Sequence, residues 1–367
     1  MLEDIGAKYA NLIIRSLNQN AASKMTKNWL TASLVLFAII VSSAHAKIGT
    51  DYQMQLGNPS NATTDTNNHS HYLIQRTVEA LDYNDNLREP NWASWDLTTD
   101  DVGSSGRSTF ILDTTLPGNF YWVKPTDYTG SGYDRGHMCP SGDRTVSTSV
   151  NDLVFYMSNI IPQTPDNNQG VWESLESYCR TIAAQGNELL ITCGPSGFGT
   201  NQINAAGLVY IPSNTWKIVV IVTNGTDMAT NRITTATRVI AVNIPNIAGI
   251  RSAPWTNYLV SVNQLQTNTG YTFFSALPAY TAAVLRAKVD GQPQPVIPPP
   301  LSASVTKGTN LSLSWPAGAA GFSLQQNTSL GNTNWTACTG NISTNAATVT
   351  VTVTVSTGNK FFRLVHP

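Results

Sequence analysis

The chain has 367 residues, of which 41% are hydrophobic, and this excludes an intrinsically disordered protein. Charged residues make up only 12%, and the net charge of −1 leaves no basic tail of the kind that binds nucleic acid without specificity. Four cysteines in this length exclude a disulfide-dense scaffold.

The N-terminal segment has the pattern of an export signal. A short basic start at Met25-Thr26-Lys27-Asn28 precedes an apolar run over Leu34–Val41, and Ser42–Ala46 ends in a small-residue A-x-A pattern. The run is too short to span a bilayer comfortably, so we expect cleavage after Ala46 and a secreted or periplasmic mature protein with no membrane attachment. Residues 1–24 precede a second methionine, Met25, which indicates that translation starts there and that the start codon of Met1 lies too far upstream. An uncleaved N-terminal anchor is the alternative.

Residues 47–290 combine helical and strand periodicity, which predicts an α+β domain. Continuous apolar runs at 189–192, 216–222 and 237–242 indicate buried strands. The clearest helix is expected over 171–184, with Gly186 as its C-terminal stop. Strands outnumber helices in this region.

A Pro-rich linker at 291–301 separates this domain from a C-terminal segment of different amino-acid composition. Such proline density favours a stiff, extended spacer. Residues 302–367 are rich in Thr, Ser and Asn, and both 311–315 and 349–355 alternate apolar and polar side chains. This period of two predicts half-buried strands, so we expect a small all-β sandwich with either a binding or a passive stabilising role.

One histidine lies among a dense set of candidate functional residues. His137 ends the segment Asp134-Arg135-Gly136-His137, and Asn168, Trp172, Glu176 and Arg180 follow at spacings of four. On a helix each such step turns by only about 40°, so these four side chains form one slowly winding stripe. The alternative is a solvated helix face with an ion pair between Glu176 and Arg180.

These residue types fit hydrolysis of a phosphodiester. Histidine is a good general base near neutral pH. The carboxamide oxygen of Asn168 suits Mg²⁺, which keeps several waters and needs few protein ligands, and Glu176 would hold metal-bound water. Arg135 and Arg180 would offer planar guanidinium groups to phosphate oxygens.

The sequence resembles the DNA/RNA non-specific endonuclease family, which includes secreted bacterial nucleases and the mitochondrial endonuclease G group. The resemblance rests on Asp134-Arg135-Gly136-His137, on Ser158–Gln163 and on the spaced Asn168, Glu176 and Arg180. It covers roughly 53–285 and leaves out the C-terminal module. It implies a central antiparallel sheet carrying a ββα-metal (His-Me finger) site, and cleavage of DNA and RNA to 5′-phosphate products.

The resemblance also implies residue roles. His137 would be the general base, Asn168 the direct ligand of Mg²⁺ (or Mn²⁺), and Glu176 the group that orders metal-bound water. The remaining implied residues are Arg107, Arg135 and Arg180, which would contact phosphate, and Asn159, which would orient groups near His137. The role of Arg107 rests on the shortest sequence match to the family, Gly106–Phe110.

Other interpretations of the same residues stay open. Asp134 would orient His137 or, as we favour, have a structural role beside a basic neighbour. We reject one further interpretation, Cys139 near His137 as a thiol nucleophile, because no oxyanion hole accompanies it and the nuclease residues are complete without it. An exported chain permits one disulfide among Cys139, Cys179 and Cys193, and the sequence does not say which.

Two other classes of function compete with an endonuclease. One is a phosphodiesterase that acts on small nucleotides. The other is an exported binding or adhesion protein in which the C-terminal sandwich is the working part. Base preference, strand preference and oligomeric state have no signal in the sequence.

Overall fold

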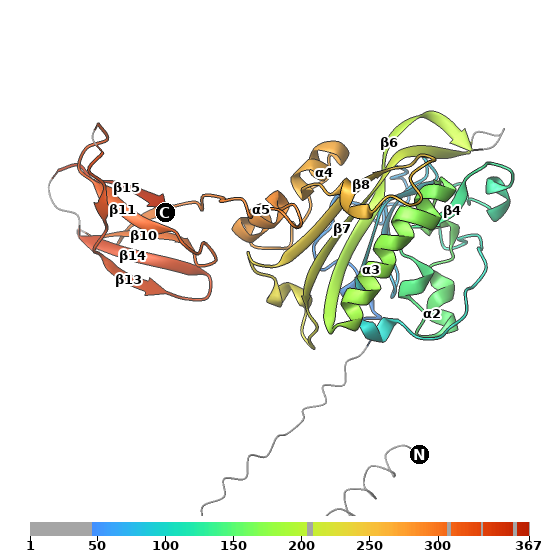
Figure 1. Ribbon diagram of the computed structural model, residues 1–367, viewed down its shortest axis with the longest axis horizontal. Coiled ribbons are helices and arrows are strands. Elements are labelled where there is room, and N and C mark those ends of the chain that lie inside the picture. The colour runs from blue at the N-terminus through green and yellow to red at the C-terminus, as the bar shows by residue number, and fades with distance from the viewer. Residues whose placement is uncertain (1–45, 204–207, 307–309, 332, 355–357, 367) are drawn as a thin grey trace, which may run out of the picture. The chain divides into compact units, whose positions relative to one another are not determined.

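A large antiparallel sheet forms the centre of the N-terminal domain (Figure 1). The computed structural model describes residues 46–203, 208–306, 310–331, 333–354 and 358–366, so the expected signal segment before Ala46 lies outside the described residues. The six strands follow the order β1-β2-β3-β6-β7-β8, and all neighbours are antiparallel. Their bounds are Tyr72–Gln75 (β1), Ala80–Asn84 (β2), Glu89–Leu97 (β3), Asn187–Ile203 (β6), Val209–Thr223 (β7) and Arg238–Pro245 (β8).

Both faces of this sheet are covered, which explains the continuous apolar runs in the sequence. Along β7, Trp216, Ile218 and Val220 face one hydrophobic core, and Val219 faces the other. Alternation of side chains along a strand therefore places Lys217 on the same face as Val219.

Helices pack on each face of the sheet. Helices α4 (Val262–Thr269) and α5 (Ala279–Ala287) contribute to the core that contains Trp216. On the other face lie α2 (Thr148–Leu153), α3 (Glu173–Ala184) and the short hairpin of β4 (Asp134–His137) and β5 (Ile160–Gln163). The 3-10 turns are η1 (Thr50–Tyr52), η2 (Thr99–Asp101), η3 (Pro125–Tyr128), η4 (Ser141–Asp143), η5 (Met157–Asn159), η7 (Ala229–Arg232) and η8 (Trp255–Tyr258).

The helix expected over 171–184 differs at its start. Residues Asn167–Trp172 form a π-helical segment, η6, and the α-helix begins at Glu173. Sequence periodicity does not distinguish a π turn from an α turn over so short a stretch. At the other end Gly186 has φ +86°, the left-handed conformation expected of a helix stop.

The C-terminal residues form two small sheets, so the α+β class with a small β-sandwich is confirmed. One sheet has the order β13-β14-β10-β9 and the other β12-β11-β15. Side chains of both sheets, among them Trp315, Leu324 and Val351, share one core. The strands are Ser302–Thr306 (β9), Asn310–Pro316 (β10), Ser323–Asn327 (β11), Thr336–Ala337 (β12), Asn341–Thr344 (β13), Thr348–Thr354 (β14) and Phe361–Val365 (β15).

Helices with the length and apolar character of a bilayer span are absent from the described part of the chain.

Candidate active site

A ββα unit builds the candidate site. Strand β4 carries the segment from Asp134 to His137 and pairs with β5, and the chain then continues through η6 into α3. At position 136 a Cβ atom would lie 1.8 Å from Oε1 of Gln163, whose Nε2 donates to Oδ1 of Asn167. Any larger residue here, one position before the histidine, would have to displace the buried side chain of Gln163.

Five of the expected residues line one cavity of about 350 Å³. These are Arg107, His137, Asn168, Glu176 and Arg180, and the other lining residues are Pro140, Ser141, Gly142, Gln169 and Glu173. Trp172 belongs to the same stripe in sequence but is buried in the hydrophobic core. The polar members of the stripe thus share the cavity, whereas the aromatic one anchors the helix to the sheet.

Two expected residues do not line the cavity. The guanidinium of Arg135 donates two hydrogen bonds to the carbonyl of Pro125, at 3.1 and 2.8 Å, and lies over the ring of Phe110. Asn159 is fully buried, where its Oδ1 accepts from the backbone N–H of Cys139 and its Nδ2 donates to the Cys139 carbonyl. Asn159 therefore holds the backbone just beyond His137.

The Asp134 carboxylate contacts two side-chain amides. In the part of the chain that the structure describes, it contacts neither His137 nor a basic neighbour, the two partners that the sequence suggested. Its Oδ2 accepts hydrogen bonds from Nδ2 of Asn168 at 2.9 Å and from Nε2 of Gln169 at 2.7 Å. With its nitrogen engaged in this way, the Asn168 carboxamide keeps its oxygen available to a ligand.

His137 lies in a largely apolar setting. The rings of Phe110 and Phe155 have their centroids 5.1 and 4.7 Å from the imidazole, and Nε2 is buried without a hydrogen-bond partner among the described residues. Burial, assisted by the positive charge of Arg107, lowers the pKa of His137 to about 3. The imidazole is therefore neutral at physiological pH.

Glu176 and Arg180 have separate partners. An Oε1 atom of Glu176 lies 3.5 Å from Nζ of Lys217, and Arg180 donates from Nη1 to Oδ1 of Asp143 at 2.9 Å. No ion pair joins Glu176 to Arg180, both of which the structure describes. Burial raises the pKa of Glu176 to about 7, although Lys217 opposes this rise.

Comparison with known proteins identifies the family. The profile of the DNA/RNA non-specific endonuclease family matches residues 56–280. The chain belongs to this family. It is therefore a hydrolytic enzyme that cleaves nucleic acids.

Named relatives of this nuclease come from bacteria, fungi and animals. A nuclease of Nostoc sp. is 43% identical over 64% of this chain and 85% of its own length. Nuclease C1 of Cunninghamella echinulata is 28% identical over 64% of this chain and 92% of its length. The human mitochondrial nuclease EXOG is 30% identical over 55% of this chain, which spans only 56% of that protein.

A solved structure supports the fold of this nuclease. The crystal structure of the EndoG/EndoGI complex, which concerns the mechanism of EndoG inhibition, has a chain that matches with a TM-score of 0.52. The match covers 61% of this chain and 91% of that chain, at 22% identity.

The family is one of metal-dependent nucleases, and the site has donors for a hard cation. Within the described ranges, no group of three or more His, Cys, Asp or Glu side chains is placed to hold a metal ion. The Asn168 oxygen and the nearby Glu176 carboxylate fit a cation that retains most of its water, as Mg²⁺ does.

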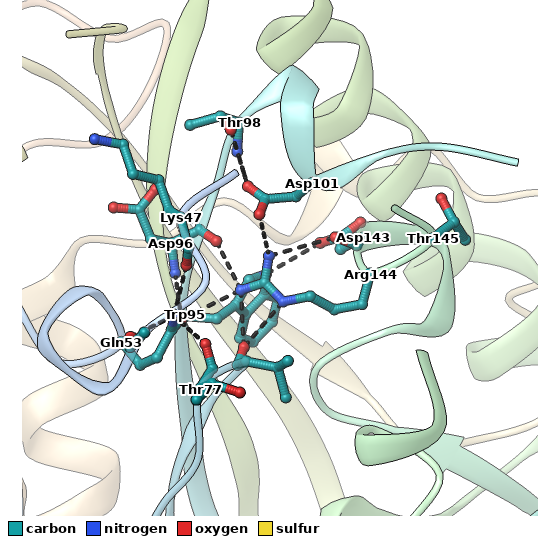
Figure 2. Close-up of polar contacts among 12 residues, drawn as sticks. Lys47, Gln53, Thr77, Trp95, Asp96, Thr98, Asp101, Asp143, Arg144 and Thr145 are labelled. Atoms are coloured by element: carbon teal, nitrogen blue, oxygen red, sulfur yellow. Dashed lines mark hydrogen bonds and ion pairs between the residues drawn. The ribbon is translucent and has the colours of Figure 1, made fainter. Parts of the chain in front are cut away.

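Sequence reasoning missed the groups beneath the cavity of this nuclease. Figure 2 shows Arg144, which is fully buried and donates to the carbonyls of Val78 and Asp96 and to Oε1 of Gln53. Its Nη1 lies 3.3 Å from Oδ1 of Asp101. These contacts fix the turn that carries Asp143. Lys217, the partner of Glu176, was also missed. Its one signal in the sequence is that it is a lone charged residue inside the apolar run 216–222.

The cysteines of the nuclease body are not cross-linked. Cys139, Cys179 and Cys193 are buried free thiols, and burial raises the pKa of each. A raised thiol pKa disfavours the thiolate form, which argues against Cys139 as a nucleophile.

Proposed function

We propose that this protein is an exported, Mg²⁺-dependent endonuclease that hydrolyses phosphodiester bonds of both DNA and RNA to 5′-phosphate products. The observation that carries the proposal is the convergence of His137, Asn168, Glu176 and two arginines on one cavity. Each member has a task in phosphodiester hydrolysis, and contacts to phosphate carry no base sequence information.

His137 is the general base. A neutral imidazole accepts a proton from water as the water oxygen forms a bond to phosphorus and the bond from phosphorus to the 3′ oxygen breaks. The phosphate remains on the 5′ side, and the departing 3′ oxygen takes a proton from a second water molecule and becomes a hydroxyl. The depressed pKa of His137 keeps the imidazole unprotonated before substrate arrives, and the negative phosphate offsets the influence of Arg107.

Asn168 and Glu176 form the cation side of the cavity. Mg²⁺, when bound, would stabilise negative charge on the phosphate and the leaving oxygen. The Asn168 oxygen would be its direct protein ligand, oriented by Asp134. The Glu176 carboxylate would accept hydrogen bonds from water of its hydration shell.

Arginines supply the remaining positive charge. Arg107 and Arg180 line the cavity and would contact the non-bridging phosphate oxygens. Arg135, held by the Pro125 carbonyl and stacked on Phe110, would act on the same phosphate only after leaving that carbonyl.

Export and domain division are also part of the proposal. The signal pattern over 25–46 supports secretion or transfer to the periplasm. The nuclease domain would span 47–290, with 291–301 as a spacer and 302–367 as an accessory sandwich.

The test is a plasmid-nicking assay on the purified protein, with parallel assays on single-stranded RNA and a dinucleotide. We expect DNA and RNA cleavage that stops with EDTA and returns with Mg²⁺. His137→Ala should remove it, and His69→Ala, at a histidine outside the cavity, should retain it. An undiminished His137→Ala protein would contradict the assigned base, and hydrolysis of the dinucleotide alone would favour a small-nucleotide phosphodiesterase.

A further inference from the structure

Glu176 and Arg180 stand four residues apart on α3, the spacing at which a carboxylate and a guanidinium commonly pair. They do not pair in this protein. Arg180 contacts Asp143 at 2.9 Å, and Glu176 contacts Lys217 at 3.5 Å. Each catalytic candidate thus has its own counter-charge, supplied by a different segment of the chain.

Lys217 lies beneath the cavity and away from solvent. Its side chain is 1% exposed, and its ammonium lies 4.1 Å from the ring centroid of Trp172 and 5.5 Å from that of Trp95. Two aromatic faces favour a cation but do not replace its hydration. Glu176 supplies the carboxylate that compensates the buried charge.

Charged and titratable groups approach Glu176 from several elements. Lys217 comes from β7, Arg180 and Cys179 from α3, Asp143 from the turn after β4, and Cys193 from β6. His137, Arg107 and Glu173 line the open side of the cavity. Lys217 is the nearest cation to Glu176, since the guanidinium of Arg180 is engaged by Asp143 and Ser177.

We propose that Lys217 is a positioning residue that holds the Glu176 carboxylate by an ion pair and directs it away from Arg180. With Lys217 in place, Glu176 stays an acceptor for hydrogen bonds from a hydrated cation, and Arg180 stays on Asp143, the position from which it would contact phosphate. Without it, Glu176 either takes up a proton or swings to Arg180. The inference rests on the role proposed for Glu176 and extends it to a residue outside the cavity.

The decisive variant is Lys217→Met, which keeps the length of the side chain and removes its charge. Loss of an opposite charge at this distance raises a carboxyl pKa by about one to three units. Burial already raises the pKa of Glu176 to about 7 although Lys217 opposes the rise. The acid limb of the pH–rate profile should therefore move to higher pH by about one unit or more. Activity should fall most near pH 7 and recover toward pH 9.

A second readout uses the metal-free protein. The carbonyl-carbon NMR signal of Glu176, assigned with Glu176→Gln, should titrate at a correspondingly higher pH in Lys217→Met. The matched control is Lys288→Met, because Lys288 is also a buried lysine but donates to the backbone carbonyl of Thr237. It should leave both pH midpoints unchanged.

The outcomes separate the possible failures. A uniform loss of activity at every pH, with an unshifted Glu176 titration, would overturn the proposal and leave Lys217 a packing residue. If Lys217→Met does not fold, Lys217→Met/Glu176→Gln should restore folding by removing the unpaired carboxylate, and a double variant that stays unfolded would also overturn it. A wild-type protein without nuclease activity would refute the proposed function, while the NMR titration would still test the Lys217–Glu176 contact.

Discussion

Asp134 decides how firmly the Asn168 carboxamide is oriented. The Asp134→Ala variant loses the charged acceptor that lies 2.9 Å from Nδ2 of Asn168. A hydrogen bond to a charged group is worth about 1.5–3 kcal/mol, and the half-buried position of Asp134 favours the lower value. About 1.5 kcal/mol corresponds to roughly a tenfold loss of Mg²⁺ affinity, within the range of about 10–100-fold typical of groups that orient metal ligands.

The assay is plasmid cleavage as a function of Mg²⁺ concentration. In Asp134→Ala the half-saturating Mg²⁺ concentration should rise about tenfold, whereas kcat at saturating Mg²⁺ should change much less. Asp134→Asn retains an acceptor oxygen without the charge and should show a smaller rise. Asp65→Ala, at an exposed acid outside the cavity, makes the same change in net charge. Equal Mg²⁺ requirements in Asp134→Ala and Asp65→Ala would refute the reasoning.

Three further variants test the surroundings of the site. Asp143→Asn removes the charged partner of Arg180 and should lower kcat about 10–100-fold with an unchanged circular dichroism spectrum; wild-type kcat would contradict this. Arg144→Met leaves the buried Asp101 carboxylate without its cation and should reduce the free energy of unfolding in urea by about 3–5 kcal/mol. A reduction below about 1 kcal/mol would disprove that Asp101 depends on Arg144 for its stability. The pKa of His137 is about 3 in the folded protein, below the ordinary value of about 6.5. As the pH falls below about 6.5, the unfolded chain therefore binds a proton that the folded protein does not bind, and the free energy of unfolding falls. The free energy of unfolding should fall between pH 7 and pH 5 in both proteins, and the fall should be about 2 kcal/mol smaller in His137→Gln than in the wild type. Equal falls would argue against a buried neutral imidazole.

Local sequence determined much of this nuclease. The alternating and continuous apolar runs predicted strands that the structure contains, because side-chain direction along a strand follows from backbone geometry alone. The spacing of Asn168, Glu176 and Arg180 placed three polar groups on one side of a helical segment for the same reason. The family motif named the residues that the cavity brings together.

Tertiary structure decided the partners and the protonation of those residues. Glu176 was expected to pair, if at all, with Arg180 on its own helix, but Lys217 of β7 and Asp143 of the turn after β4 take those contacts. Arg135 and Asn159 belong to the motif, yet one contacts a backbone carbonyl and the other is buried in the core. Burial and approach of charges from distant segments set the pKa of a side chain. Neither is encoded in the few residues around it, so the sequence supplied the functional groups and only the folded chain set their charges.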